Sequence, residues 1–182
     1  MLRRFVGPPL IDSFMKYYGF SEKQAREAVK RYREYFREKG VFENQIYEGI
    51  PELLSVLKEQ DKKLAIATTK PTVFARQVLE YFQIEHYFED NLIIGSYLDG
   101  RRTVKAELVG AVLDLLSTDD GRLVMVGDRK YDMIGAKTHS IDSIGVTYGY
   151  GEEEEITLAE PTYIAHSVDE LSALLTRENS IK

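Results

Sequence analysis

The sequence predicts an α/β fold in which a parallel sheet carries helices on both faces and a small helical unit precedes it. From residue 51 onward, short apolar runs typical of buried strands alternate with segments whose apolar residues recur at helical spacing, and this alternation favours a parallel sheet. Before residue 51 the chain has two helical segments and no strand pattern. We therefore expect a helical unit over residues 1–44 and an α/β unit over residues 45–182.

Two helices are expected in the helical unit. Residues 7–9, Gly-Pro-Pro, form a rigid turn that leads into a helix over residues 10–18, and Gly19 ends that helix. Ser21 and Gln24 match a capping box at the start of a longer helix that runs to about Lys39. Five aromatic residues on these helices either form helix-packing core or line a ligand surface: Tyr17, Tyr18, Tyr32, Tyr35 and Phe36.

Strands and helices alternate in the α/β unit. Strands are expected over residues 64–68, 91–96, 123–126, 143–147 and 163–165. Helices are expected over residues 51–60, 72–82 and 104–116, from about residue 131, and around Leu171, Leu174 and Leu175. The acidic run at residues 152–155 is a solvated loop or the start of a helix. Because residues 64–68 and 123–126 lack polar alternation, both strands are expected to be covered on both faces.

The composition excludes several classes of function. A net charge of −6 leaves no general basic surface, so we expect no nucleic-acid partner. No apolar run is long enough to span a bilayer and no signal-peptide pattern is present, so we expect no membrane association. The lack of cysteine excludes disulfides, thiolate metal sites and a cysteine nucleophile, and three scattered histidines argue against zinc. Together these absences predict a cytoplasmic protein.

Two carboxylates follow the apolar run at residues 123–126. Asp128 comes after Gly127, at the carboxyl end of the expected strand, and Asp132 lies four residues later in the first turn of the next helix. Two carboxylates one helical turn apart repel each other unless a positive group lies between them. A hard divalent cation such as Mg²⁺ would fit. The alternative is structural, with Asp128 as the helix N-cap and Asp132 stabilised by the helix dipole.

Hydroxyl and lysine side chains follow two other expected strands. Thr68 ends the first strand and is followed by Thr69, Lys70 and Pro71, so hydroxyls and a helix N-terminus converge into a potential anion site. The alternative is that the threonine only caps the helix. Lys105 lies at the start of the helix after residues 91–96, where the helix dipole disfavours a cation, and this position favours a role facing an anion.

The order of these residues resembles the haloacid dehalogenase-like (HAD) hydrolase superfamily, in particular its phosphoglycolate phosphatase-like branch with a small helical cap. The matching positions are residues 7–10, 47–53, 67–70, 105 and 127–132, which span nearly the whole chain. The resemblance implies a Rossmann-type sheet and a Mg²⁺-dependent phosphatase that acts on a small phosphorylated substrate. It also implies that Thr68 and Thr69 bind phosphate, that Thr68 and Lys105 are catalytic with Lys105 neutralising the phosphoryl oxygens, and that Asp128 and Asp132 hold Mg²⁺.

The chain departs from the family at its nucleophile. The family nucleophile belongs to an Asp-x-Asp motif on a first, central strand upstream of the cap, between the strands that here end at Thr68 and Gly127. None of the eleven aspartates forms such a pair. We therefore expect an N-terminally truncated phosphatase that is inactive or impaired. Either the two neighbouring strands close up, or another polypeptide supplies a strand, or the chain is a fragment. We expect the unfilled position to invite strand exchange or a homodimer.

Two other functions remain open at this point. A non-catalytic module could keep the phosphate and Mg²⁺ sites and use its unfilled sheet position to recruit a partner. A receiver-type or flavodoxin-like protein shares the α/β architecture, but it fits poorly because the chain begins with a helical pair. Arg3 and Arg4 are either solvated or contact a second anionic group of the substrate.

Overall fold

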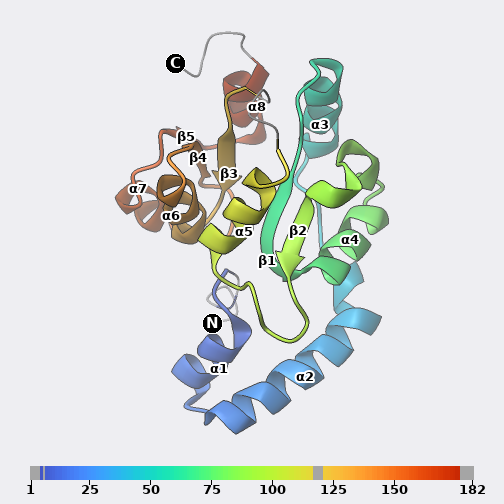
Figure 1. The fold of residues 1–182 in the computed structure, drawn as a ribbon, viewed down its shortest axis with the longest axis vertical. Coiled ribbons are helices and arrows are strands. Elements are labelled where there is room, and N and C mark those ends of the chain that lie inside the picture. Colours follow the sequence, from blue (N-terminus) through green and yellow to red (C-terminus); the bar gives the residue numbers. More distant parts are fainter. Residues whose placement is uncertain (1–4, 6, 117–120, 177–182) are drawn as a thin grey trace.

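Parallel strands with helices around them make up the chain from residue 50 onward, as predicted (Figure 1). The structure, a computed structural model, describes residue 5 and residues 7–116 and 121–176. Arg3 and Arg4 therefore lie outside the described residues. The helices are α1 (Leu10–Tyr18), α2 (Glu22–Glu38), α3 (Ile50–Glu59), α4 (Thr72–Tyr81), α5 (Lys105–Leu113), α6 (Lys130–Thr138), α7 (Glu153–Leu158) and α8 (Val168–Thr176). The strands are β1 (Ile66–Pro71), β2 (Ile93–Ser96), β3 (Val124–Gly127), β4 (Asp142–Val146) and β5 (Tyr163–Ala165).

The strands form two parallel sheets rather than one. The first sheet pairs β1 with β2, and the second has the order β3-β4-β5. Within the described residues, β1 and β3 do not pair with each other, so the expectation that these neighbours close up is wrong. One edge of β1 and one edge of β3 therefore have no strand partner in this part of the chain, which agrees with a missing central strand.

The two strands next to this break are less buried than predicted. Every residue of β1 and of β3 is partly exposed, whereas four consecutive residues of β4, Ser143 to Val146, are buried. β4 has a strand on each side, but β1 and β3 each have a strand on one side only. β1 also differs in its limits, because it runs from Ile66 to Pro71, whereas the strand was expected over residues 64–68.

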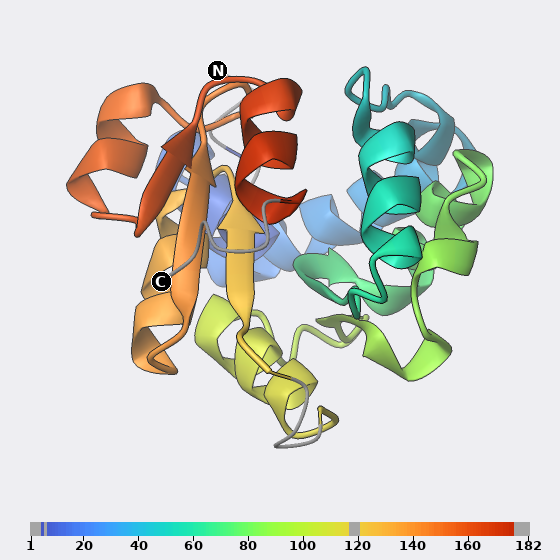
Figure 2. The same ribbon diagram turned by 90° about the horizontal axis from the view of Figure 1, so that it is seen from above.

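Helices on opposite faces hold the two sheets together. On one face, α3 contributes Leu53 and Leu57 to a core cluster with β4, β5 and α8, and it contributes Leu54 to a second cluster with β1, β2 and α4. On the opposite face, α5 contacts both β1 and α6 (Figure 2). Burial of apolar side chains under α3 and α5 therefore stabilises the arrangement without hydrogen bonds between β1 and β3.

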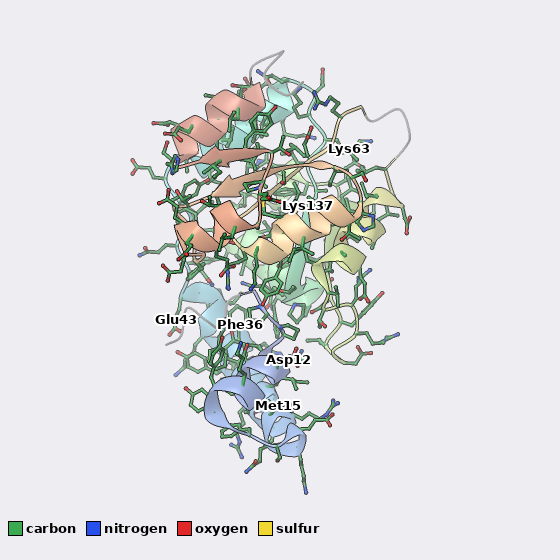
Figure 3. The ribbon with its side chains drawn as sticks, turned by 90° about the vertical axis from the view of Figure 1, so that its left-hand side faces the viewer. Asp12, Met15, Phe36, Glu43, Lys63 and Lys137 are labelled. Carbon is green, nitrogen blue, oxygen red and sulfur yellow. The ribbon has the colours of Figure 1, made fainter. Side chains whose placement is uncertain are left out.

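α1 and α2 project from one end of the molecule (Figures 1 and 3). Gly19 ends α1 in the left-handed conformation, with φ of 66°, and Ser21 and Gln24 form the predicted capping box of α2. Phe36 packs its buried ring against Phe74 of α4, with ring centroids 5.3 Å apart, as predicted for helix-packing core. Tyr18, Tyr32 and Tyr35 are 48%, 42% and 48% exposed. Tyr32 nevertheless stacks on Phe36, and the ring of Tyr18 contacts those of Phe14 and Phe20, so both take part in aromatic packing at the surface.

The acidic run at residues 152–155 begins α7, so the helix-start alternative is confirmed. No helix among the described residues combines the length and the apolar character needed to cross a membrane.

Candidate functional site

The predicted site residues lie at the carboxyl ends of β1 and β3 and at the starts of α5 and α6. Thr68 and Thr69 belong to β1, and Asp128 directly follows β3. Lys105 is the first residue of α5, and Asp132 lies in the first turn of α6. Carboxyl ends of parallel strands form the edge where ligands bind in open α/β sheets, so the positions agree with a ligand site.

Lys105 and Asp132 are in direct contact. The Nζ atom of Lys105 lies 2.8 Å from Oδ1 of Asp132 and donates a second hydrogen bond of 2.7 Å to the carbonyl oxygen of Ala67. The two side chains are only 13% and 7% exposed. Because Ala67 belongs to β1, this one ammonium group connects α5 and α6 to β1 at the break between the sheets. The structure therefore supplies a positive partner for Asp132, the second carboxylate of the pair.

Asp132 uses both of its carboxylate oxygens. Oδ2 accepts a hydrogen bond of 3.0 Å from the backbone N–H of Arg129, while Oδ1 faces Lys105. A Cβ atom at position 127 would overlap the side chain of Asp132, so glycine is the residue that this close approach requires. Asp132 is thus held by the Lys105 ammonium and by the backbone N–H of Arg129, and it packs closely against Gly127.

Asp128 is held by the loop that follows β4. Its Oδ2 atom accepts a hydrogen bond of 2.8 Å from the backbone N–H of Tyr150. The residue that directly precedes α6 is Arg129 and not Asp128, so the interpretation of Asp128 as the helix N-cap is wrong. Burial, together with Tyr47 and Asp128, raises the pKa of Tyr148 to about 12, so this phenol stays protonated beside the carboxylate at neutral pH.

The two threonines of β1 differ in their contacts. Thr68 Oγ1 accepts a hydrogen bond of 3.2 Å from the backbone N–H of Lys70. Thr69 Oγ1 donates a hydrogen bond of 3.2 Å to the carbonyl oxygen of Gly7, which connects the start of the chain to the site. Pro71 precedes α4, and no side chain caps that helix. The simple interpretation of Thr68 as a helix cap is therefore wrong, and the first turn of α4 keeps its N–H donors.

Two basic residues belong to this region although sequence reasoning gave them no role. Arg129 forms an ion pair with Glu155 of α7, with 2.9 Å between Nε and Oε1, and its Nη1 atom is buried without a hydrogen-bond partner among the described residues. Burial lowers the pKa of Lys70, whose ammonium lies 4.9 Å from the ring centroid of Phe36. In the sequence, the only signal that could have revealed these two residues was their position, since Arg129 follows Asp128 and Lys70 follows Thr69.

The carboxylates suit a hard divalent cation in part. Mg²⁺ takes oxygen ligands and usually binds through one or two carboxylates, completed by waters and substrate phosphate. Asp128 has one carboxylate oxygen, Oδ1, that accepts no hydrogen bond in the described structure, whereas both oxygens of Asp132 are engaged. No cluster of three or more acidic or histidine side chains suited to a metal occurs in residues 7–116 and 121–176. The donor chemistry therefore fits Mg²⁺ at Asp128, with Asp132 beside it.

Comparison with known proteins matches the chain to one hydrolase family and to several named relatives. A family described as "haloacid dehalogenase-like hydrolase" matches residues 1–146. A "5'-nucleotidase" from Pseudomonas aeruginosa is 44% identical over 173 residues, which are 95% of this chain and 76% of that protein. "Tyrosine-protein kinase PtkA" from Mycobacterium tuberculosis is 37% identical over 93% of this chain, which spans only 58% of the kinase. Further relatives are named "phosphoglycolate phosphatase".

A solved structure has the same arrangement. The crystal structure of a predicted phosphatase from Clostridium acetobutylicum superposes with a TM-score of 0.87 and is 48% identical, over 94% of this chain and 79% of that one.

Proposed function

Because the chain belongs to the haloacid dehalogenase-like hydrolase family, we propose that it binds small phosphate monoesters and serves their Mg²⁺-dependent hydrolysis. The observation that carries this proposal is the contact of Lys105 with both Asp132 and the carbonyl of Ala67, next to Asp128, at the carboxyl ends of β1 and β3. A cation, two carboxylates and hydroxyls near the carboxyl ends of two strands are groups that can bind a phosphoryl group and neutralise its charge, although the nucleophile is not among them. Relatives named phosphatase and nucleotidase agree with this chemistry.

Each residue has a proposed role. The hydroxyls of Thr68 and Thr69, with the free N–H groups at the start of α4, bind phosphoryl oxygens. Lys105 neutralises the charge that develops on the transferring group. Asp128 and Asp132 would hold Mg²⁺, which when bound neutralises phosphoryl charge. Asp132 also positions Lys105, since the two side chains are in contact.

The nucleophile is proposed to come from a strand between β1 and β3. The sequence has no Asp-x-Asp pair, and the facing edges of β1 and β3 have no strand partner among the described residues. A parallel strand there would satisfy the hydrogen-bonding groups of both edges, and its carboxyl end would meet Thr68 and Asp128. By itself, the chain is then expected to bind the ester without hydrolysing it efficiently.

Residues 1–44 are proposed to act as a cap that selects the substrate, and residues 45–182 as the catalytic core. α1 and α2 lie at the end of the molecule toward which β1 and β2 run (Figure 1). Thr69 contacts Gly7, and Lys70 contacts Phe36, so the ends of the first unit approach the phosphate-binding residues. A cap in this position would exclude water from the reacting phosphate.

The first test measures binding and hydrolysis together. Wild type and Asp128→Asn are titrated with adenosine 5'-monophosphate and with an aryl phosphate, with and without Mg²⁺. We expect Mg²⁺ to strengthen ester binding to wild type. In Asp128→Asn this strengthening of the affinity is expected to be at least about tenfold smaller. Neither protein is expected to show hydrolysis. Adenosine 5'-monophosphate is included because a relative is named 5'-nucleotidase.

Two results of this test would contradict the proposal. If neither Mg²⁺ nor the Asp128→Asn substitution changed the affinity for the ester, the assignment of the site to these residues would be wrong. Hydrolysis by wild type that disappears in Asp128→Asn would show that a carboxylate of this chain is the nucleophile, and the proposed strand between β1 and β3 would then be unnecessary.

The unfilled sheet position gives a second prediction, of a homodimer or strand exchange. Unpaired strand edges attract pairing with another chain. We expect light scattering to show a dimer whose fraction rises with protein concentration. A compact monomer at all concentrations would exclude pairing between copies through β1 and β3.

A second candidate function is a non-catalytic module that binds phosphate and Mg²⁺. The missing Asp-x-Asp pair is the observation that favours it. A fusion experiment distinguishes the two candidate functions. The first strand of a close relative is fused ahead of residue 1, and binding and hydrolysis are measured. Hydrolysis by the fusion protein supports the enzyme, and tight binding without turnover supports the module.

A further inference from the structure

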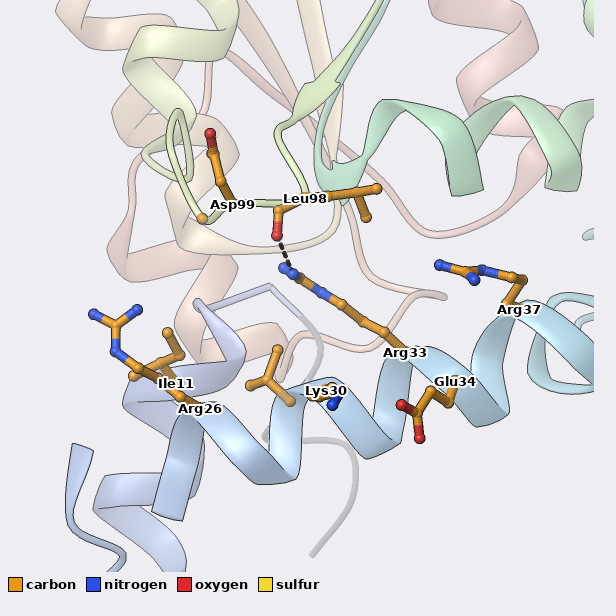
Figure 4. A pocket seen from close by; sticks show the side chains of 10 residues that line it. Ile11, Arg26, Lys30, Arg33, Glu34, Arg37, Leu98 and Asp99 are labelled. Carbon is orange, nitrogen blue, oxygen red and sulfur yellow. Dashed lines mark hydrogen bonds between the residues drawn. The ribbon is translucent and has the colours of Figure 1, made fainter. Parts of the chain in front are cut away.

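A cavity of about 470 Å³ lies between α2 and the loop that joins β2 to α5 (Figure 4). Its lining includes four basic side chains from a single helix: Arg26, Lys30, Arg33 and Arg37. Their spacing of four, three and four residues places all four on one face of α2. This volume falls in the range of small-molecule pockets, and the basic face makes the cavity suited to an anion.

The positive charge of the cavity is only partly neutralised by the protein. Glu34 and Asp99 are the acidic residues of the lining, and Arg26 forms an ion pair of 2.6 Å with Glu22, which lies outside the lining. Asp99 is engaged by Arg101, whose Nε donates to it at 2.8 Å. In the described part of the chain, neither Lys30 nor Arg37 has an ion-pair or hydrogen-bond partner. The cavity therefore combines a surplus of basic groups with two cations that are free to bind a ligand.

Arg33 carries an unsatisfied donor within this cavity. Its side chain crosses the space from α2, and Nη1 donates a hydrogen bond to the carbonyl oxygen of Leu98 (Figure 4). Its Nε atom is buried and has no hydrogen-bond partner in the described structure. Buried polar atoms are almost always hydrogen-bonded, so an unpartnered guanidinium N–H points to a ligand that completes the site. Phosphate and carboxylate oxygens are the acceptors that a guanidinium fork binds best.

The cavity lies on the same side of the sheets as the candidate phosphate site. Leu98, Asp99 and Gly100 follow the carboxyl end of β2, and the same loop leads to Lys105 at the start of α5. Ile11 and Leu98 add apolar surface beside the basic face. A ligand with an apolar body and an anionic end would therefore contact both kinds of surface.

We propose that this cavity binds an anionic group of a small organic molecule that carries at least two phosphate groups. If that molecule is the substrate, a point that rests on the proposed function, its second phosphate lies at α2 while its ester lies at Thr68. If it is a separate effector, it occupies the cavity alone. The recognition chemistry is the same in both cases: bidentate guanidinium contacts with phosphate oxygens, reinforced by the two cations without partners.

The test measures binding of adenosine 3',5'-bisphosphate by calorimetry. The cavity variant is Lys30→Gln/Arg37→Gln, and the control with the same loss of charge on the same helix is Lys23→Gln/Arg31→Gln, whose residues are outside the cavity lining. All four side chains are exposed, so both variants are expected to fold, which a urea unfolding curve checks. We expect the cavity variant to bind at least about tenfold more weakly and the control to change by less than about twofold.

Thr68→Val distinguishes the two sources of the ligand. Weaker bisphosphate binding in Thr68→Val as well as in the cavity variant would identify one molecule that spans both sites. Weaker binding in the cavity variant alone would identify a separate effector. Equal affinity of the cavity variant and its control, or no binding by wild type, would overturn the proposal. Failure of the proposed function can be told apart from failure of the cavity proposal. It would appear as monoester binding that neither Mg²⁺ nor Asp128→Asn changes.

Discussion

Replacing Lys105 by methionine is expected to lower the free energy of unfolding by about 3–5 kcal/mol. The substitution removes the only cation that contacts Asp132 in the described structure and leaves a carboxylate whose residue is 5% exposed. It also removes the hydrogen bond to the carbonyl of Ala67. A buried charge without its partner is costly because it has lost its hydration and gained nothing in return. Urea unfolding of wild type and variant measures the difference.

Lys137→Met is the matched control for Lys105→Met. Lys137 pairs with Glu160 at the same distance of 2.8 Å, but the two side chains are 50% and 80% exposed. Exposed ion pairs contribute about 0–1 kcal/mol, so this variant is expected to lose little. Adding Asp132→Asn to Lys105→Met is expected to recover part of the loss, since the uncompensated charge is removed. Equal losses in Lys105→Met and Lys137→Met would show that Asp132 does not depend on the ammonium group.

Replacing Gly151 by alanine is expected to destabilise the chain by about 1–3 kcal/mol and to displace Asp128. A Cβ atom at position 151 would overlap the backbone carbonyl oxygen of Asp128. Backbone atoms cannot rotate aside as a flexible side chain does, so the loop from Tyr148 to Gly151 or the turn after β3 has to move. Mg²⁺-dependent ester binding should fall with stability, because the N–H of Tyr150 that fixes Asp128 is one residue away.

Gly110→Ala provides the comparison for Gly151→Ala. Gly110 lies within α5, and a Cβ atom there would meet a ring atom of His139 at 3.0 Å, which is a side-chain contact. Alanine is favoured over glycine inside a helix by about 1 kcal/mol, and this gain offsets the cost of moving the ring. We expect a change near zero in unfolding free energy and an unchanged response to Mg²⁺. If Gly151→Ala behaved in the same way, the close contact with Asp128 would not constrain the loop.

Local signals in the sequence were sufficient for most of the secondary structure. Gly19, Ser21 and Gln24 predicted the end of α1 and the capping box of α2, because these effects depend on residues within four positions of one another. The limits of β1 were less predictable. Thr69, Lys70 and Pro71 extend the strand beyond its predicted end at Thr68, and Pro71 lies opposite Ser96 of β2 after an irregularity in the pairing. That pairing joins residues far apart in sequence, so local signals did not reveal it.

The candidate site was predictable as a set of residues but not as a set of contacts. Thr68, Lys105, Asp128 and Asp132 were predicted from their positions after strands and from their order along the chain. The pairing of Lys105 with Asp132 rather than with a ligand, and the approach of Gly7 to Thr69, join residues far apart in sequence. The basic cavity was missed because its second wall comes from a loop whose Leu98 lies 65 residues after Arg33, and no periodicity in the helix reveals that contact.

By itself, the sequence determined the α/β class, the order of helices and strands and the absence of an Asp-x-Asp pair, and it predicted the residues of the candidate site. Each of these depends on residue type, on short-range spacing or on order along the chain. Only the tertiary structure decided that β1 and β3 belong to separate sheets, that α3 and α5 hold those sheets together, and that Lys105 neutralises Asp132. The physical reason is that strand pairing, helix packing and buried ion pairs join distant parts of the chain, and their partners are fixed only when the whole chain has folded.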